Sequence, residues 1–328
     1  MKVLVLGGTG YIGARLCTML SLCGWAEPVI ASRRMGVDTT DIDSMQRALG
    51  GMDAVVNCVA GSADAIAKGA RVLVAAAEKA GLPRIVHLST MSVYGALEGE
   101  ITEASPRDPS IGWYAKAKCE AEDIVAEYPG EAVMLRPGCV WGAGSELWVG
   151  RIARLLRARR LGDLGAGGDG WSNLVGLDDV CAAIIASLRI DITPGTPRVF
   201  NLAAPDSPRW NDYFVDLALE IGATPVARIS ARRMKLDAKV LGPPLKVAEI
   251  VMRKLGRAAQ SVPDPLPPGL LGVFERQLHL RSELAQRELG IEWTPYHRVL
   301  RQSADWLDGA APSHRAADIT AARVSPAR

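Results

Sequence analysis

The sequence lacks both a strong excess of charge and a long uninterrupted apolar run. Its 38 Lys and Arg residues nearly balance 36 Asp and Glu residues, which gives a formal net charge of +2. The overall charge therefore gives no reason to expect nucleic acid or an anionic membrane as a partner. No apolar stretch reaches the roughly 18 uncharged residues that indicate a membrane-spanning helix, so we expect no membrane partner.

Cysteine and histidine are sparse and do not cluster. There are six cysteines and four histidines, and no two cysteines form a C-x-x-C pair. This pattern argues against a zinc site and a disulfide framework, so we expect no metal. Scattered thiols suit a reducing compartment, and the first residues enter an apolar strand rather than a signal peptide. We therefore expect a cytoplasmic protein.

What the sequence does contain is concentrated first in residues 1–13, MKVLVLGGTGYIG. A short apolar strand over residues 2–6 leads into a glycine turn, and a helix is expected over residues 11–22. Gly7 allows the tight turn, Gly10 lets the backbone approach a ligand, and Gly13 lets helix and strand pack closely. The N–H groups at the helix start would face a pyrophosphate. We expect a dinucleotide site with further contacts from Thr9, Tyr11 and Ile12; the alternative is a glycine turn that binds nothing.

Apolar runs and helical patterns then alternate up to residue 204, in a chain of 328 residues that is 48% apolar. Strands are expected over 28–32, 53–58, 84–89, 132–136 and 198–202, and helices over 42–49, 63–79, 113–128 and 178–188. This alternation predicts an α/β fold with a doubly wound parallel sheet of the Rossmann type.

The chain is expected to divide into two parts and a tail. Residues 1–165 are expected to form the NADP-binding Rossmann domain, to which residues 171–204 return. From residue 205 helices and proline-rich links dominate, so residues 205–308 are expected to form a smaller, mostly helical substrate subdomain. Residues 309–328 carry no apolar periodicity and are predicted to be disordered.

The end of the second strand indicates which dinucleotide is bound. In a dinucleotide fold an acidic residue there bonds the ribose 2′-hydroxyl of NAD. Here Ser32 is followed by Arg33 and Arg34, and two guanidiniums would bind a 2′-phosphate. We expect NADP, with NAD less favoured, although a solvated basic turn remains an alternative. Further cofactor contacts are expected from Asp38, Thr39, Val59 and Ala60.

Three side chains suit hydride transfer to a carbonyl. Tyr114 and Lys118 are spaced i, i+4 on a predicted helix, and Thr90 follows the strand over residues 84–89. Because parallel strands end at one crevice, we expect the three to meet beside the glycine turn. Reduction of a carbonyl needs an acid, and a nearby ammonium with the oxidised nicotinamide should lower the tyrosine pKa from about 10. The alternative is an aromatic, a lysine and a strand end without a shared function.

Over residues 1–307 the sequence resembles the extended short-chain dehydrogenases/reductases, the NAD-dependent epimerase/dehydratase family. The matching landmarks are GGTGYIG at 7–13, LSTMSVYG at 88–95, YAKAK at 114–118, RPGCVWGAG at 136–144 and LDDV at 177–180. The resemblance implies that Thr90, Tyr114 and Lys118 are catalytic, and that Lys118 also binds the nicotinamide ribose. It further implies that Pro137 lines the nicotinamide, and that a homodimer forms through the helix bearing the tyrosine.

The sequence departs from this family in ways that bear on the reaction. Met91 and Ser92 stand where sugar dehydratases carry an Asp–Glu pair, so dehydration lacks its acid and base. Residues 171–176 contain neither the diphosphate-binding arginine nor the histidine of nucleotide-sugar epimerases. Five arginines between residues 151 and 160 offer another phosphate contact or a merely solvated face. Tryptophans near the expected crevice favour a ring or apolar substrate, with contacts from Met91, Ser92 and Trp141.

These observations predict an NADP-preferring oxidoreductase that reduces a carbonyl of a small-molecule substrate, or oxidises the alcohol. One alternative is a sugar or nucleotide-sugar epimerase with a retained cofactor, which would use the same three residues. A second alternative is a non-catalytic sensor that binds NADP.

Overall fold

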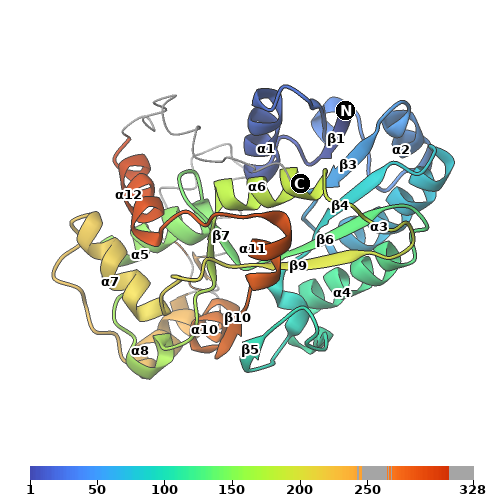
Figure 1. Cartoon of the computed structure of the whole chain (residues 1–328). Helices are drawn as coiled ribbons and strands as arrows, with labels where there is room; N and C mark the ends of the chain where they lie inside the picture. The colour runs from blue at the N-terminus through green and yellow to red at the C-terminus, as the bar shows by residue number, and fades with distance from the viewer. Residues whose placement is uncertain (242–243, 246–263, 265, 267, 310–328) are drawn as a thin grey trace.

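The computed structural model describes residues 1–241, 244–245, 264, 266 and 268–309, and Figure 1 shows the arrangement of its elements. A main sheet of parallel strands has the order β2-β1-β3-β4-β6-β9. Its strands are β1 (Lys2–Leu6), β2 (Glu27–Ala31), β3 (Ala54–Asn57), β4 (Arg84–Leu88), β6 (Ala132–Pro137) and β9 (Arg198–Leu202). The predicted doubly wound parallel sheet is confirmed.

The strand order places a ligand crevice at the carboxyl end of β1. This strand pairs with β2 on one side and with β3 on the other. The chain therefore crosses in opposite directions from β1, and open parallel sheets bind ligands at such a switch point. The glycine turn that follows Leu6 lies at this position. Beyond the edge strand β2, the chain forms a 3₁₀ turn over Arg33–Met35.

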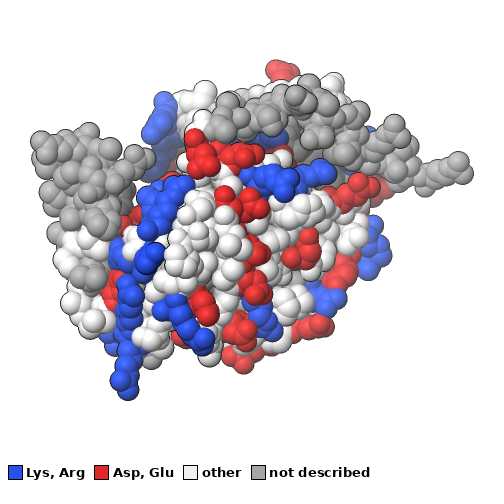
Figure 2. Space-filling model, turned by 90° about the vertical axis from the view of Figure 1, so that its left-hand side faces the viewer, with Lys and Arg blue, Asp and Glu red and all other residues white. Residues whose placement is uncertain are grey.

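A smaller part of the protein is mostly helical and lies at one end of the sheet (Figure 1). Its elements are β7 (Cys139–Trp141) paired with β8 (Leu174–Gly176), a π-helix (Glu146–Gly150), α5 (Arg151–Arg157), α7 (Trp210–Glu220), α8 (Ala231–Leu236), α10 (Pro268–Glu275) and α12 (Tyr296–Leu307). Figure 2 looks at this end and shows basic and acidic side chains on the same face.

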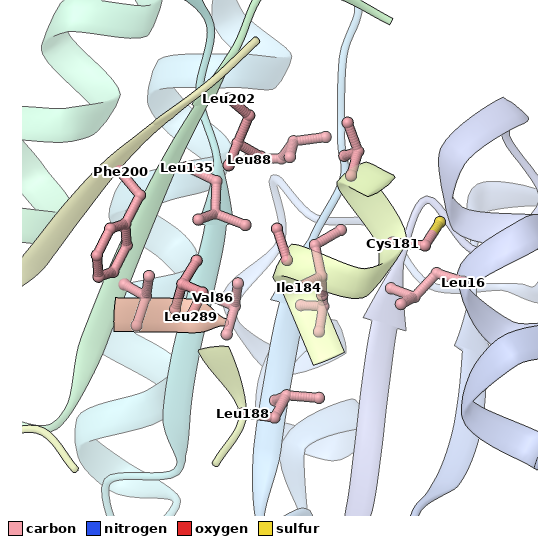
Figure 3. Packing of buried hydrophobic residues seen from close by; sticks show 14 of the residues in the cluster. Leu16, Val86, Leu88, Leu135, Cys181, Ile184, Leu188, Phe200, Leu202 and Leu289 are labelled. Carbon is pink, nitrogen blue, oxygen red and sulfur yellow. The ribbon is translucent and has the colours of Figure 1, made fainter. Parts of the chain in front are cut away.

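Helices cover both faces of the main sheet and produce two apolar layers. On one face lie α1 (Tyr11–Leu22), α6 (Leu177–Ser187) and α11 (Glu283–Leu289); on the other lie α2 (Ile42–Leu49), α3 (Ala63–Lys79) and α4 (Trp113–Ala126). Alternate residues of β1 enter the two layers, Val3 and Val5 one and Leu4 and Leu6 the other, because successive strand side chains point to opposite faces. Figure 3 shows Ile184 and Leu188 packed among residues of the first layer.

The packing and the expected division of the chain agree only in part. Strand β9 and helix α6, from residues 171–204, are built into the main sheet and its cover. Helix α5 precedes residue 165, yet its side chains share an apolar cluster with α7 and α10. The division at residue 165 therefore stays a proposal. Helix α5 packs with the elements of the smaller part.

Other differences concern non-local pairing and helix ends. Strand β10 (Leu278–Leu280) pairs with β5 (Gly99–Ile101), a contact between segments far apart in sequence that no local pattern indicated. The segment that carries the arginines of residues 151–160 starts as a π-helix over Glu146–Gly150, and its α-helix ends at Arg157. The expected disordered tail, apart from its first residue, lies outside the described residues. Within the described residues, no helix combines the length and apolarity needed to cross a membrane.

Candidate active site

The glycine turn after β1 is held by its own backbone and leaves no room for side chains. Gly7 has a φ of +77°, and its oxygen accepts a 2.9 Å hydrogen bond from the Gly10 N–H. A Cβ on Gly13 would lie 2.3 Å from that same oxygen. The third glycine therefore lets α1 start directly against the turn. No described side chain caps the first N–H groups of α1, which leaves them available to an anion.

Tyr11 connects this turn to the loop that follows β7. A Cβ on Gly142 would lie 3.6 Å from the Tyr11 hydroxyl, and one on Gly144 would lie 3.3 Å from its ring. Burial raises the pKa of Tyr11 well above its ordinary value. The phenol therefore stays neutral and acts as a packing surface between the glycine turn and residues 142–144.

At the end of β2, the Ser32 hydroxyl and the guanidiniums of Arg33 and Arg34 have no partners among the described residues. The Ser32 hydroxyl is buried and has no hydrogen-bond partner among the described residues. Arg33 and Arg34 are exposed, and neither forms an ion pair with a described acidic group. A 2′-phosphate would accept hydrogen bonds from all three side chains. This donor set, with the cradle at Gly13, fits NADP.

Asp38 and Thr39 hold the loop that follows this turn. The Asp38 carboxylate accepts hydrogen bonds from the N–H (2.9 Å) and hydroxyl (2.8 Å) of Thr40, and these bonds lower the pKa of Asp38. A Cβ on Gly69 of α3 would lie 3.6 Å from the Thr39 hydroxyl. Asp38 is thus engaged with its own turn, while Thr39 packs on α3.

The end of β3 lies against the glycine turn. A Cβ on Gly7 would approach the oxygen of Cys58 to 3.1 Å, and the Val59 N–H donates to the Asn57 side chain at 3.1 Å. Val59 is half-buried, and Ala60 is exposed beyond it. Val59 and Ala60, the two expected cofactor contacts, therefore come directly after the end of β3, which touches the glycine turn. Pro137 ends β6, where it pairs with Leu202 of β9.

Thr90 and Tyr114 are in contact at this edge of the sheet. Thr90 begins the 3₁₀ turn Met91–Tyr94, and its hydroxyl accepts a 3.2 Å hydrogen bond from the Ser92 N–H. The phenol of Tyr114, which lies in the first turn of α4, is close to this hydroxyl. Burial raises the pKa of Tyr114, and the neighbouring Thr90 hydroxyl opposes this rise. The expected lowering of the tyrosine pKa is thus absent from the protein alone.

Lys118 lies one helical turn further along α4 and is buried, with 3% of its surface exposed. Its Nζ atom donates a 2.7 Å hydrogen bond to the oxygen of Leu88, two residues before Thr90. Burial lowers the pKa of Lys118 to about 8, while the nearby Cys58 and Glu122 act in the opposite direction. The lysine therefore sits beneath the Thr90 segment, as a cation that titrates close to neutral pH.

The three side chains expected to touch substrate differ in their surroundings. Ser92 bonds to the Thr90 hydroxyl at 3.3 Å, and Met91 is half-buried between two apolar clusters. Trp141, by contrast, is 1% exposed and stacks on Tyr296 with ring centroids 5.3 Å apart. It offers no free face to a ligand because it belongs to the core of the smaller part. Trp113 is 59% exposed and meets the Tyr114 ring edge-on at 5.7 Å.

The arginines of α5, and Arg160 just after this helix, are largely committed to ion pairs. Arg154 bonds Asp264 at 2.5 Å and also pairs with Glu146, and Arg160 bonds Asp237 at 2.8 Å. Carboxylates therefore neutralise most of the helix face that the sequence offered as a phosphate contact.

A model of the NAD dependent epimerase/dehydratase family matches residues 3–203. The chain belongs to this family. Among curated relatives, "Protein YeeZ" of Escherichia coli K12 is 27% identical over 69% of this chain and 86% of its own length. A ketoreductase of Stigmatella aurantiaca, named for 4-hydroxy-2-methyl-3-oxo-4-farnesyl-3,4-dihydroquinoline-1-oxide, is 25% identical over 96% of this chain and 100% of its own.

Solved structures of similar fold include a UDP-glucuronic acid 4-epimerase from Bacillus cereus in complex with UDP-glucuronic acid and NAD. It is 16% identical, covers 95% of this chain and 100% of its own, and has a TM-score of 0.70. This likeness shows the fold. The family match and the curated reductase relatives make the chain an enzyme of the short-chain dehydrogenase/reductase type that uses a nicotinamide dinucleotide.

Sequence reasoning missed a set of buried polar residues behind the family site. Glu122 of α4 forms an ion pair with Arg136 of β6, and the Asn57 side chain bonds the His87 ring at 3.2 Å. Burial lowers the pKa of His87 to about 3, so its ring stays neutral. One signal was available, because Glu122 follows Lys118 by four residues and so shares its helix face. The partner on β6 carried no such signal.

Proposed function

We propose that the protein is an NADP-preferring ketoreductase that reduces a carbonyl of an apolar small molecule, or oxidises the corresponding alcohol. The observation that carries this proposal is the placement of the Tyr114 phenol beside the Thr90 hydroxyl, with the Lys118 ammonium bound to the main-chain oxygen of Leu88, two residues before Thr90. Two hydroxyls aimed at one point can hold and protonate a single carbonyl oxygen.

When bound, the nicotinamide would supply the hydride. Thr90 holds the carbonyl oxygen beside Tyr114, and the phenol gives its proton to that oxygen as negative charge develops. The raised pKa of Tyr114 keeps this proton in place at neutral pH. The charged Lys118 then stabilises the phenolate that remains, since opposite charges in a buried site attract strongly.

The preference for NADP rests on the end of β2. Ser32 offers a buried hydroxyl without a described partner, and Arg33 and Arg34 offer two guanidiniums outside any described ion pair. An adenosine ribose without a phosphate would leave this donor set unused.

The substrate class rests on the surroundings of the trio of Thr90, Tyr114 and Lys118. The exposed ring of Trp113 and the half-buried side chain of Met91 are apolar groups next to Tyr114 and Thr90. A relative in the same family is named as a ketoreductase of a farnesyl-bearing ring compound. Both observations favour a ketone with an apolar ring or chain.

An epimerase with a retained cofactor is the second candidate, and nucleotide-sugar epimerases of the same fold favour it. It would employ the same trio. Against it stands the diphosphate subsite, because residues 171–176 contain no arginine, and Arg154 on α5 and Arg160 just after this helix are paired with carboxylates.

The two functions differ in net turnover. The purified protein is given NADPH and a panel of apolar ketones, and then UDP-sugars, while NADPH absorbance and product configuration are followed. A ketoreductase consumes one NADPH for each alcohol formed. Conversion of UDP-sugars without net consumption of added NADPH would establish the epimerase instead. Absence of any turnover, with NADPH still bound, would favour the non-catalytic sensor.

The proposal also covers the roles of the two parts of the chain, the assembly of the protein and its location in the cell. Residues 206–307 cover the crevice and select the substrate, while residues 1–140 hold the cofactor. Subunits pair as a homodimer through α4, and the protein works in the cytoplasm. A structure with bound cofactor tests the first, light scattering in solution tests the second, and cell fractionation tests the third.

A further inference from the structure

A buried ion pair joins α4 to strand β6. The Arg136 guanidinium donates from Nε to Glu122 Oε1 at 2.8 Å and from Nη2 to Glu122 Oε2 at 2.6 Å. The two residues are 5% and 1% exposed. This two-pronged contact fixes the direction of both side chains, because the guanidinium and the carboxylate are planar groups that match each other.

The third prong of the same guanidinium continues the network. Arg136 Nη1 donates to the Tyr94 hydroxyl at 2.8 Å, and that hydroxyl donates to the Asn201 side chain on β9 at 2.7 Å. Tyr94 and Asn201 are fully buried. On the other side Arg107 reaches Glu122 at 3.5 Å, which ties the loop before α4 to the pair.

These partners occupy the two segments that carry Thr90, Tyr114 and Lys118, and also the strand end at Pro137. Glu122 lies one turn after Lys118 on α4, Tyr94 closes the turn that starts at Thr90, and Arg136 directly precedes Pro137. A buried ion pair is a weak source of stability, since its replacement by apolar residues of similar volume is often neutral or stabilising. Its presence at this junction therefore calls for a role other than stability.

We propose that Glu122 and Arg136 are positioning residues of this site, holding α4, the Thr90 turn and the end of β6 in the one arrangement in which Thr90, Tyr114 and Lys118 converge. This inference rests on the proposed function insofar as that convergence serves catalysis.

One member of the pair, Glu122, also acts on Lys118 through charge. Buried groups face Lys118 from each packed element: Cys58 at the end of β3, His87 on β4, and Glu122 on α4 itself. Cys58 and His87 are neutral at ordinary pH, because burial raises the thiol pKa to about 12 and lowers the imidazole pKa to about 3. Glu122 is the carboxyl group among them, and it opposes the effect of burial on the pKa of Lys118.

The test uses two variants and a matched control on the same helix. Glu122→Gln removes the charge, and the double variant Glu122→Leu, Arg136→Met replaces the pair with apolar side chains. The control is Glu120→Gln, two residues earlier on α4, whose ion pair with Arg71 is exposed. Each protein is checked by thermal unfolding. The Lys118 pKa is then measured by NMR of labelled lysine carbons in the protein without substrate, and kcat and KM are measured with NADPH and ketone.

We expect Glu122→Gln to lower the Lys118 pKa by about one pH unit, and the control to leave it unchanged. The folded double variant should retain NADPH binding and lose roughly 10–100-fold in kcat with little change in the ketone KM, since misplaced groups impair the chemical step. If Glu122→Gln does not fold, the Lys118 pKa and the kinetic constants are both measured on the double variant.

Two results would overturn the proposal. One is a folded double variant with the kcat and Lys118 pKa of the control. The other is a double variant that does not fold, because the pair would then serve folding itself. The lysine titration requires no substrate, so it decides the role of Glu122 even if the protein reduces no ketone, which would count against the proposed function alone.

Discussion

The Nζ atom of Lys118 donates a 2.7 Å hydrogen bond to the main-chain oxygen of Leu88. This contact links α4 to the strand that ends at Thr90, so the ammonium is held under the segment on which the reaction depends. Burial there lowers the lysine pKa to about 8, against an ordinary value of 10.5. A group with this pKa is charged at neutral pH and loses its charge within an accessible range.

The first prediction is a pH limit set by Lys118. Because its pKa in the folded protein is lowered to about 8, the ammonium is present below that pH and lost above it. We expect kcat for reduction to be level near neutrality and to fall as pH rises through about 8. Lys118→Met should be weakly active throughout and lack this limb. A wild-type limb that survives in Lys118→Met would assign the titration to another group.

The second prediction concerns Tyr114. Tyr114→Phe keeps the ring and removes the proton donor, so folding and NADPH affinity should persist. General acid catalysis contributes about 10²–10⁴-fold, and kcat should fall by that factor. The matched control is Tyr128→Phe, whose hydroxyl bonds Pro83 at the far end of α4. It should lower stability by about 1 kcal/mol without a change in kcat. Equal activity of the two variants would show that another residue moves the proton.

The third prediction concerns cofactor choice. Replacing Arg33 and Arg34 together with Ala should weaken NADPH binding by about 1–3 kcal/mol, the range of charge-assisted hydrogen bonds. NADH affinity should hardly change, because NADH has no 2′-phosphate. Arg47→Ala on the exposed side of α2 is the control and should affect neither cofactor. Titration of each protein with both cofactors measures the dissociation constants, and tighter wild-type binding of NADH would contradict the NADP preference.

The fourth prediction concerns the glycine turn. Gly13→Ala places a Cβ 2.3 Å from the Gly7 oxygen, so the turn must shift and dinucleotide binding should weaken strongly. Gly272→Ala on α10 is the control, because its Cβ meets no described atom within 4 Å. It should be tolerated and stabilise the helix by about 0.5–1 kcal/mol. Equal cofactor affinity of the two variants would remove the turn from the binding site.

The sequence by itself determined the parts of this protein that depend on neighbouring residues. The strand–glycine turn–helix start follows from local backbone freedom, and α2, α3 and the first helix have the bounds that their periodicity predicted. The i, i+4 spacing of Tyr114 and Lys118 placed them on one helix face. The parallel sheet followed from the alternation of such local units, since parallel strands require a crossover between them.

Tertiary structure alone decided which side chains are buried and which charges meet. The sequence did not distinguish a buried tryptophan from an exposed one. Trp141 is packed in the core because Tyr213 and Tyr296, from distant segments, cover it, whereas Trp113 is exposed beside Tyr114. Arg154 on α5 and Arg160 just after this helix find carboxylates on distant segments, at Asp264 and Asp237. Burial under α4 sets the pKa of Lys118, and β6 brings Arg136 to Glu122. Pairing and burial are properties of segments far apart in the chain, so no local pattern can encode them.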